Sequence, residues 1–153
     1  MIDLLAELTT VAATSAFSTM ADCALTAQPA TALALNGERC ITSSVRYSGP
    51  VSGVLHLHAP ARFARQISAT LLAHARADDV PDELVADTMG EFTNMVIAKL
   101  QSRLTDRGTP CVITPPDLAW HPHFTPHGTP GPRCRTLPFA CKHGQLVIEL
   151  LLT

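Results

Sequence analysis

The stretch 81-PDELVADTMGEFTNMVIAKLQSRL-104 carries the strongest local pattern in this sequence. Proline is well tolerated in the first turn of a helix, and the acids Asp82 and Glu83 suit the positive end of the helix dipole. Three residues near the other end are typical of a helix C-terminus: Arg103, Arg107 and Gly108. The pattern therefore predicts one long helix over residues 81–104.

This helix has two different sides. At about 100° per residue, one side is apolar and forms the expected core face, with Val85, Met89, Phe92, Val96 and Leu100. The opposite side presents Asp87, Glu91 and Asn94 at positions i, i+4 and i+7, so one partner surface could contact all three. Ala98, one turn further on, leaves room for close approach. On an arbitrary amphipathic helix, such a polar side is only a solvated face.

The sequence around the helix predicts further elements. Helices are expected over residues 2–24 and 61–76, and strands over residues 31–35, 39–48, 51–58, 111–114 and 145–152. Asn36-Gly37 suits a tight turn that would pair the strands 31–35 and 39–48 as a hairpin. Residues 121–132, rich in His, Pro and Gly, are expected to form a loop. The order of elements predicts an α+β fold, in which an N-terminal helix and two central helices pack on an antiparallel or mixed sheet.

Composition limits what this chain can be. Its 153 residues suit one domain, 1–153, and a formal charge of -2 argues against nucleic-acid binding. No apolar run approaches the roughly 18–20 residues of a membrane span, and the first residues carry acids rather than the basic start of a signal peptide. We therefore expect a cytoplasmic protein whose five cysteines are reduced and packed as small hydrophobes.

A longer pattern distinguishes the polar side of the helix from an ordinary solvated face. Asp87 is followed after three residues by Glu91, after two more by Asn94, and after twenty-one more by Pro116. This spacing resembles the signature of the CheC/CheX/FliY phosphatases, in which an acidic residue or Ser precedes Glu, Asn and a distant Pro. The run 87–104 and the order of elements around it resemble the CheX branch most. The resemblance extends over most of residues 1–118 and is weakest over 119–138.

The resemblance implies a function. Members of this family dephosphorylate the phospho-aspartate of CheY-like response regulators in chemotaxis or two-component signalling. It implies that Asn94 orients the attacking water and that Glu91 docks on a lysine of the regulator. Asp87, Ala98 and Pro116 would be supporting residues at the interface. It also implies a homodimer and no cofactor of the chain's own, because the regulator would supply Mg²⁺.

Other interpretations remain open at this point. A CheX-like domain could bind a receiver without hydrolysing anything, and the apolar end 144-GQLVIELLLT-153 would also allow a purely structural dimer. Imidazole and thiolate suit zinc, but His121, His123, His127, Cys134 and Cys141 lack the usual ligand spacing, so no metal site is expected. His56 and His58 share one side of the strand at 51–58 and are expected to form a polar strand face or interface.

Overall fold

The predicted long helix is α3, Asp82–Asp106, in a computed structural model that describes residues 1–35, 37–73 and 76–153. The helix ends just before Gly108, the glycine that the sequence indicated as part of its C-terminus. The Gly108 N–H donates to the Thr105 carbonyl at 3.0 Å, and the Thr109 N–H donates to the Leu104 carbonyl at 2.9 Å. Gly108 has φ 77°, a left-handed conformation that glycine adopts without steric cost.

Two other helices begin where the sequence predicted, and both end before the predicted residue. They are α1, Ile2–Ala21, and α2, Ala61–Leu71. Pro60 precedes the first turn of α2, and the Glu38 carboxylate accepts a hydrogen bond from the Arg62 backbone N–H at 3.1 Å. Such a side-chain acceptor satisfies one of the N–H groups that a helix start leaves without a partner. Two 3-10 turns also occur: η1, Ala30–Ala32, and η2, Ala77–Asp79.

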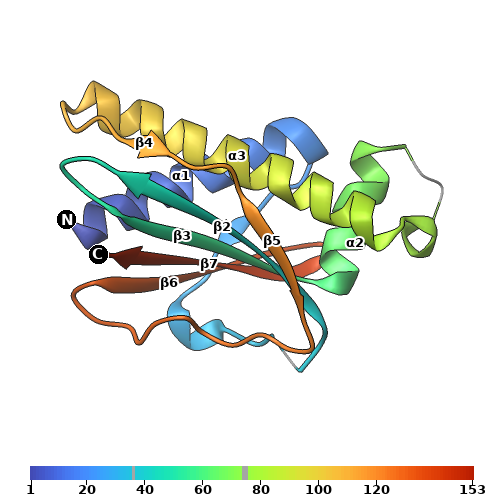
Figure 1. The fold of residues 1–153 in the computed structure, drawn as a ribbon. Coiled ribbons are helices and arrows are strands. Elements are labelled where there is room, and N and C mark those ends of the chain that lie inside the picture. The colour runs from blue at the N-terminus through green and yellow to red at the C-terminus, as the bar shows by residue number, and fades with distance from the viewer. Residues whose placement is uncertain (36, 74–75) are drawn as a thin grey trace.

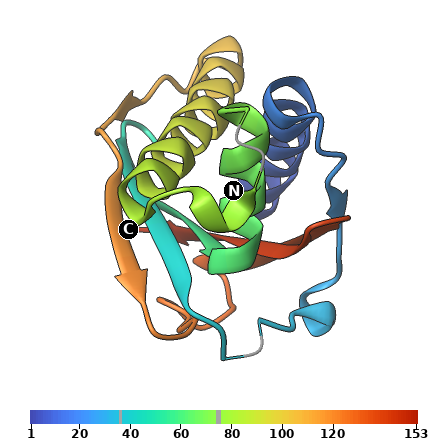
Figure 2. The ribbon, with the colours of Figure 1, turned by 90° about the vertical axis from the view of Figure 1, so that its right-hand side faces the viewer.

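The strands form one antiparallel sheet in the order β1-β6-β7-β3-β2-β4, with β5 also paired to β2. Their bounds are β1, Thr26–Ala27; β2, Cys40–Ser48; β3, Gly53–Pro60; β4, Val112–Ile113; β5, Asp117–His121; β6, Cys134–Cys141; and β7, Gly144–Leu152. All three α-helices lie on the same face of this sheet (Figure 1, Figure 2). The predicted α+β class is confirmed, and the sheet is antiparallel rather than mixed.

The core lies between the helices and the sheet. The apolar side chains predicted for the inner side of α3 are all buried, and alternate residues of the strands, such as Leu55 and Leu57, are buried with them. Phe17 of α1 stacks on Phe92 of α3 with ring centroids 4.5 Å apart. Burial of such side chains is the main stabilising contribution to a fold of this kind. It also fixes which side of α3 faces outward.

The predicted hairpin of 31–35 with 39–48 is wrong. Residues 30–32 form η1, and β2 pairs instead with β3 on one side and with β4 and β5 on the other, so neither edge is free for 31–35. Gln145 holds the segment by its side-chain amide: Oε1 accepts from the Ala34 N–H at 2.7 Å, and Nε2 donates to the Ala32 carbonyl at 2.9 Å. Asn36 of the predicted turn lies outside the described residues.

The second half of the chain contains two strands that the sequence interpretation missed. β5 begins directly after Pro116 and pairs with β2, and β6 pairs with β7 although it contains Pro138. Proline lacks an N–H donor and is unfavourable within a strand pattern, so the prolines hid both elements. Between them, residues 122–133 cross the sheet face opposite the helices (Figure 1).

The C-terminal strand and the cysteines were also singled out in the sequence. The final strand β7 lies between β3 and β6, so both its backbone edges are paired and cannot pair with a second copy of the chain. All five cysteines are free, four are buried and Cys141 is partly buried, as expected of thiols packed as small hydrophobes. Within the described ranges, no helix is both long and apolar enough to cross a membrane.

Candidate functional site

The polar side of α3 faces solvent, as the helical spacing predicted. Asp87 and Glu91 are exposed and Asn94 is partly exposed, whereas their helix neighbours Met89 and Phe92 are buried. The helix positions the three side chains because residues three and four apart lie above one another on its surface. A rigid, well-packed helix therefore presents this group outward.

Pro116 and β5 lie beside these side chains, and together they enclose a shallow hollow of about 300 Å³, called the α3 hollow below. The lining residues are Asp87, Gly90, Glu91, Asn94, Pro116 and Leu118. Asp87, Glu91, Asn94 and Pro116 were predicted as site residues, and the fold brings them together although Pro116 is distant in sequence. Ala98 is exposed on the same helix but does not line the hollow.

Gly90 and Leu118 were missed by the sequence interpretation. A Cβ atom at Gly90 would lie 3.4 Å from Leu118 Cδ2 and 3.7 Å from Pro116 Cγ, which are ordinary van der Waals distances, so Gly90 faces these two residues directly. A glycine inside a helix costs about 1 kcal/mol relative to alanine, which is a signal that could have marked this position. Leu118 could have been found from the alternation of apolar and other residues in 117-DLAWH-121.

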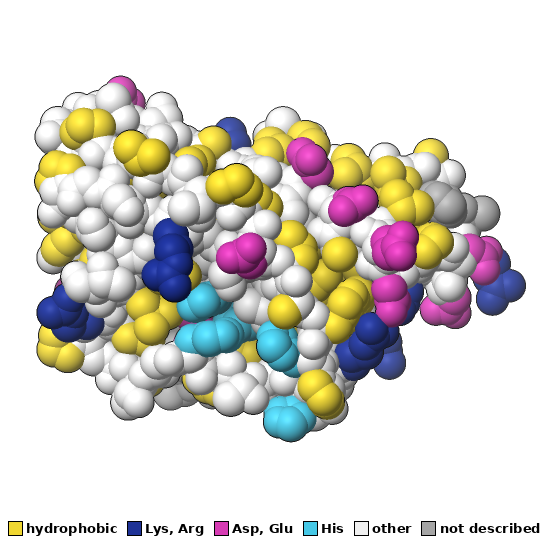
Figure 3. Space-filling view, viewed as in Figure 1, with side chains coloured by type: hydrophobic (Ala, Val, Ile, Leu, Met, Phe, Trp, Pro, Cys, Tyr) yellow, Lys and Arg dark blue, Asp and Glu magenta, His cyan; other side chains and the backbone are white. Residues whose placement is uncertain are grey.

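The three polar side chains are unpartnered within the part of the chain that the structure describes. Among the residues that the structure describes, none of them forms a hydrogen bond or ion pair through its side chain. Acidic side chains follow the outer side of α3, and hydrophobic side chains lie next to them over β5 (Figure 3). The site therefore offers exposed carboxylates, one amide and an apolar wall to a second molecule.

A second polar cluster lies on the opposite face of the sheet. The Glu149 carboxylate on β7 is fully buried and accepts a hydrogen bond from Nε2 of the buried His58 on β3 at 2.6 Å. The Thr42 hydroxyl on β2 lies 2.8 Å from Nδ1 of the same ring. Because the neutral ring carries its proton on Nε2 and donates it to the carboxylate, Nδ1 accepts a hydrogen bond from the Thr42 hydroxyl. His56 and His58 thus share a polar strand face, as expected.

His127 joins this cluster from the 122–133 segment. Its backbone N–H donates to both Glu149 oxygens at 3.1 and 3.0 Å, and its Nδ1 lies 3.2 Å from Oε1. Its ring stacks on that of His56, with centroids 4.0 Å apart. The zinc interpretation had grouped His127 with Cys134 and Cys141, whereas the structure brings it to Glu149 and His58.

Burial and hydrogen bonding set the charge states in this cluster. Burial raises the pKa of Glu149, but hydrogen bonds from His58 and the His127 backbone outweigh it and lower that pKa to about 2. Burial, reinforced by the charge of nearby His127, lowers the pKa of His56 to about 4. Burial also lowers the pKa of His58, although its bond to Glu149 opposes this. At neutral pH the cluster therefore contains one buried carboxylate, and the rings of His56 and His58 are uncharged.

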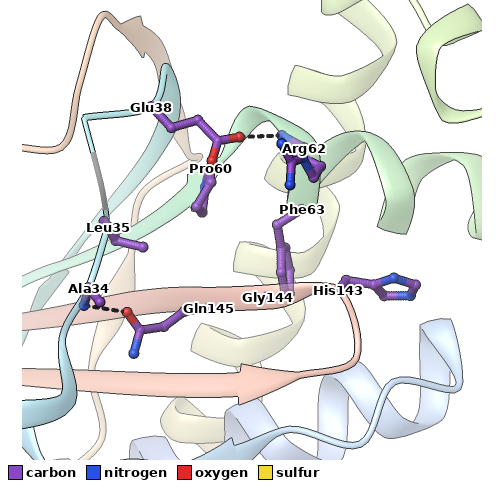
Figure 4. A pocket seen from close by; sticks show the side chains of 9 residues that line it. All are labelled: Ala34, Leu35, Glu38, Pro60, Arg62, Phe63, His143, Gly144 and Gln145. Carbon is purple, nitrogen blue, oxygen red and sulfur yellow. Dashed lines mark hydrogen bonds between the residues drawn. The ribbon is translucent and has the colours of Figure 1, made fainter.

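Another hollow, of about 180 Å³, lies beside the start of α2 (Figure 4). Two of its polar side chains are already used within the fold, because Glu38 accepts from the Arg62 backbone N–H and Gln145 holds Ala34. Phe63 contributes an apolar wall. In the α3 hollow, by contrast, the side chains of Asp87, Glu91 and Asn94 all lack a partner among the described residues, so it is the better candidate site.

Known proteins share this fold. No curated protein matches the sequence closely enough to be counted as a relative. Among solved structures, the chemotaxis protein CheX from Vibrio vulnificus is similar over 97% of this chain and 96% of its own, with a TM-score of 0.81 at 19% identity. A CheC-like superfamily protein from a Shewanella species is similar over 97% of each chain, with a TM-score of 0.82 at 20% identity.

A third similar structure is the CheX-CheY-BeF3-Mg²⁺ complex from Borrelia burgdorferi, with a TM-score of 0.74 at 19% identity over 95% of this chain and 96% of that chain. At such identities these structures show a shared fold. The sequence itself matches the family described as "Chemotaxis phosphatase CheX" over residues 41–125, more than half of the chain. This match includes α3, β5 and every residue of the α3 hollow. The chain belongs to the CheX family of chemotaxis phosphatases.

Proposed function

We propose that this protein hydrolyses the phospho-aspartate of a CheY-like response regulator, with Asn94 orienting the attacking water and Glu91 docking on the regulator. The observation that carries this proposal is the outward-facing pair on α3. Glu91 and Asn94 line one hollow with Pro116, and neither side chain is engaged within the described part of the protein. Membership of the family and the similarity to CheX in the CheX-CheY complex from Borrelia burgdorferi support the choice of partner.

The chemistry suits an amide. Hydrolysis of an acyl phosphate passes through a loose transition state, so a catalyst mainly places a water in line and stabilises charge. The Asn94 amide can accept a hydrogen bond from water and donate one to a phosphoryl oxygen, whereas a carboxylate there would repel the phosphate. The chain needs no nucleophile and no cofactor of its own, because Mg²⁺ would come with the regulator.

The neighbours of Asn94 would hold the partner. Glu91, one turn earlier on the same side, would pair with a lysine of the regulator and fix the register of the two proteins. Pro116 and Leu118 would supply the apolar contact beside this ion pair. Asp87 and Ala98 would have supporting roles at the edge of the interface. A homodimer in the cytoplasm is part of the same proposal.

The decisive experiment follows the decay of a phosphorylated regulator with and without this protein. Asn94→Ala should reduce the acceleration at least about 100-fold, the usual cost of misplacing a reacting group. Ser102→Ala is the matched control, because Ser102 is exposed on α3 outside the hollow. Circular dichroism should show both variants folded.

Three outcomes of this experiment are informative. Acceleration by the parent protein that Asn94→Ala abolishes supports the proposal. Unchanged acceleration by Asn94→Ala would overturn the role of Asn94. Binding of the phosphorylated regulator by the parent protein without any acceleration would instead support the non-catalytic receiver-binding function.

A further inference from the structure

We propose that His58, His127 and Glu149 bind one divalent transition-metal ion of the zinc class, on the sheet face opposite α3. The donor atoms of these three side chains all lie within 4.8 Å of one another. They come from β3, from the 122–133 segment and from β7, so a bound ion would join parts of the chain far apart in sequence. This site is separate from the α3 hollow and independent of the proposed phosphatase activity.

The donor set fits such an ion. Two imidazole nitrogens and one carboxylate oxygen suit zinc, and similar ions, better than they suit Mg²⁺ or Ca²⁺, which prefer oxygen ligands alone. The carboxylate of Glu149 and the ring of His58 are buried, with exposed fractions of 0% and 1%. His127 is 40% exposed, so the site lies at the edge of the protein interior.

Outer contacts already hold the ligands in place. The backbone N–H groups of His127 and Gly128 donate to the Glu149 carboxylate. Thr42 contacts Nδ1 of His58, and its hydroxyl can either donate to or accept from that nitrogen. When Nε2 binds the ion, the ring keeps its single proton at Nδ1 and donates it to Thr42. Such partners fix the orientation of metal-ligating histidines.

An ion could reach these donors from solvent. Thr42, His121 and His127 line a hollow of about 100 Å³ together with Thr125 and Pro126. This space leaves room for a water as the ligand that completes a tetrahedral site. Phe124 packs edge-on against His58, with ring centroids 4.8 Å apart, and helps to bury the His58 ring. A bound ion would replace the hydrogen bond between His58 Nε2 and Glu149 Oε1.

The test uses the purified 153-residue chain, stripped with EDTA and titrated with Zn²⁺ by calorimetry and with Co²⁺ by visible absorption. We expect one equivalent of metal per chain, a tetrahedral Co²⁺ spectrum and a higher Tm in the presence of Zn²⁺. Thr42→Val should weaken Zn²⁺ binding by about 10–100-fold, as loss of an outer partner does. His127→Ala and Glu149→Gln remove ligands and should weaken it more.

His123→Ala is the matched control, because His123 is an exposed histidine of the same segment that does not belong to the donor cluster. Its Zn²⁺ affinity should stay within about twofold of the parent, as for most surface substitutions. Equal losses in His123→Ala and His127→Ala would overturn the site, because they would indicate adventitious binding by a histidine-rich segment. Absence of stoichiometric binding, or full binding by His127→Ala, would also overturn it. If Glu149→Gln fails to fold, the Zn²⁺ affinity of His127→Ala still tests the proposed site.

Discussion

The two polar regions of this protein differ in whether their groups have partners within the fold. On the outer side of α3, Glu91 and Asn94 are accessible and form no internal side-chain bond among the described residues. On the opposite face of the sheet, Glu149 is fully buried and is bonded to His58 and His127.

This difference determines what each region can do without a further component. A buried charge must be compensated within the fold, so the Glu149 cluster contributes to stability and to the position of the 122–133 segment. An exposed polar group is compensated by water and can exchange that water for a partner molecule at small cost. Substitutions should therefore affect stability at the Glu149 cluster and function on the outer side of α3.

The largest expected effect is on the buried side. Glu149→Ala leaves the His58 Nε2–H and two backbone N–H groups without their acceptor, and should lower the free energy of unfolding by about 3–5 kcal/mol. Urea titration of the metal-free protein measures this. Glu91→Ala, which removes the same type of side chain from the exposed region, should change the free energy by less than about 0.5 kcal/mol. Equal losses in the two variants would show that the comparison is mistaken.

A smaller effect is expected from acid. The unfolded chain binds protons at its histidines below about pH 6.5, whereas His56 in the folded protein stays neutral down to about pH 4. The unfolded state therefore binds more protons in this window, and stability falls as the pH is lowered from 6.5 to 4, by about 2 kcal/mol after allowance for solvent. Below about pH 4.5, protonation of Glu149 in the unfolded chain continues the loss, towards pH 2.

Urea titrations at several pH values in the presence of EDTA measure this loss for the metal-free protein. His56→Gln is the control, because its amide can still accept from Ser44, whose hydroxyl lies 2.6 Å from Nδ1 of His56. In this variant the free energy of unfolding should fall less between pH 6.5 and pH 4 than in the parent protein. A stability that rises on acidification from pH 6.5 to 4 would contradict the assignment of an uncharged His56.

On the exposed side, Glu91→Ala should weaken binding of a phosphorylated regulator about tenfold, equivalent to about 1.4 kcal/mol. The rate at saturating regulator should change little, because Glu91 is proposed to dock and not to react. Glu7→Ala provides a control, since Glu7 is an exposed glutamate on α1. A variant that binds normally but no longer accelerates hydrolysis would exchange the roles proposed for Glu91 and Asn94.

The smallest effect is expected at the edge of the hollow. Asp87→Ala should change binding and hydrolysis by no more than about twofold, since Asp87 is exposed and has only a supporting role in the proposal. The same kinetic series as for Glu91→Ala measures it. A loss as large as that of Glu91→Ala would require Asp87 to contact the regulator directly.

Local patterns were sufficient to predict much of the fold. The sequence predicted α3, its buried and exposed sides and its C-terminus, because helix periodicity and capping depend on residues within a few positions of one another. It also predicted β3 and β7 within a few residues. It failed where pairing is long-range: 31–35 had turn residues beside it but no free strand edge, and the prolines near β5 and in β6 obscured real strands.

The sequence by itself determined the helical spacing of Asp87, Glu91 and Asn94, and thus that they share an exposed side. Only the tertiary structure decided that β5 lies against that helix, so that Leu118 completes the hollow with Pro116. It also decided that β7 inserts beside β3, which brings Glu149 to His58. These contacts follow from strand order and burial over the whole chain, and no local stretch of residues contains that information.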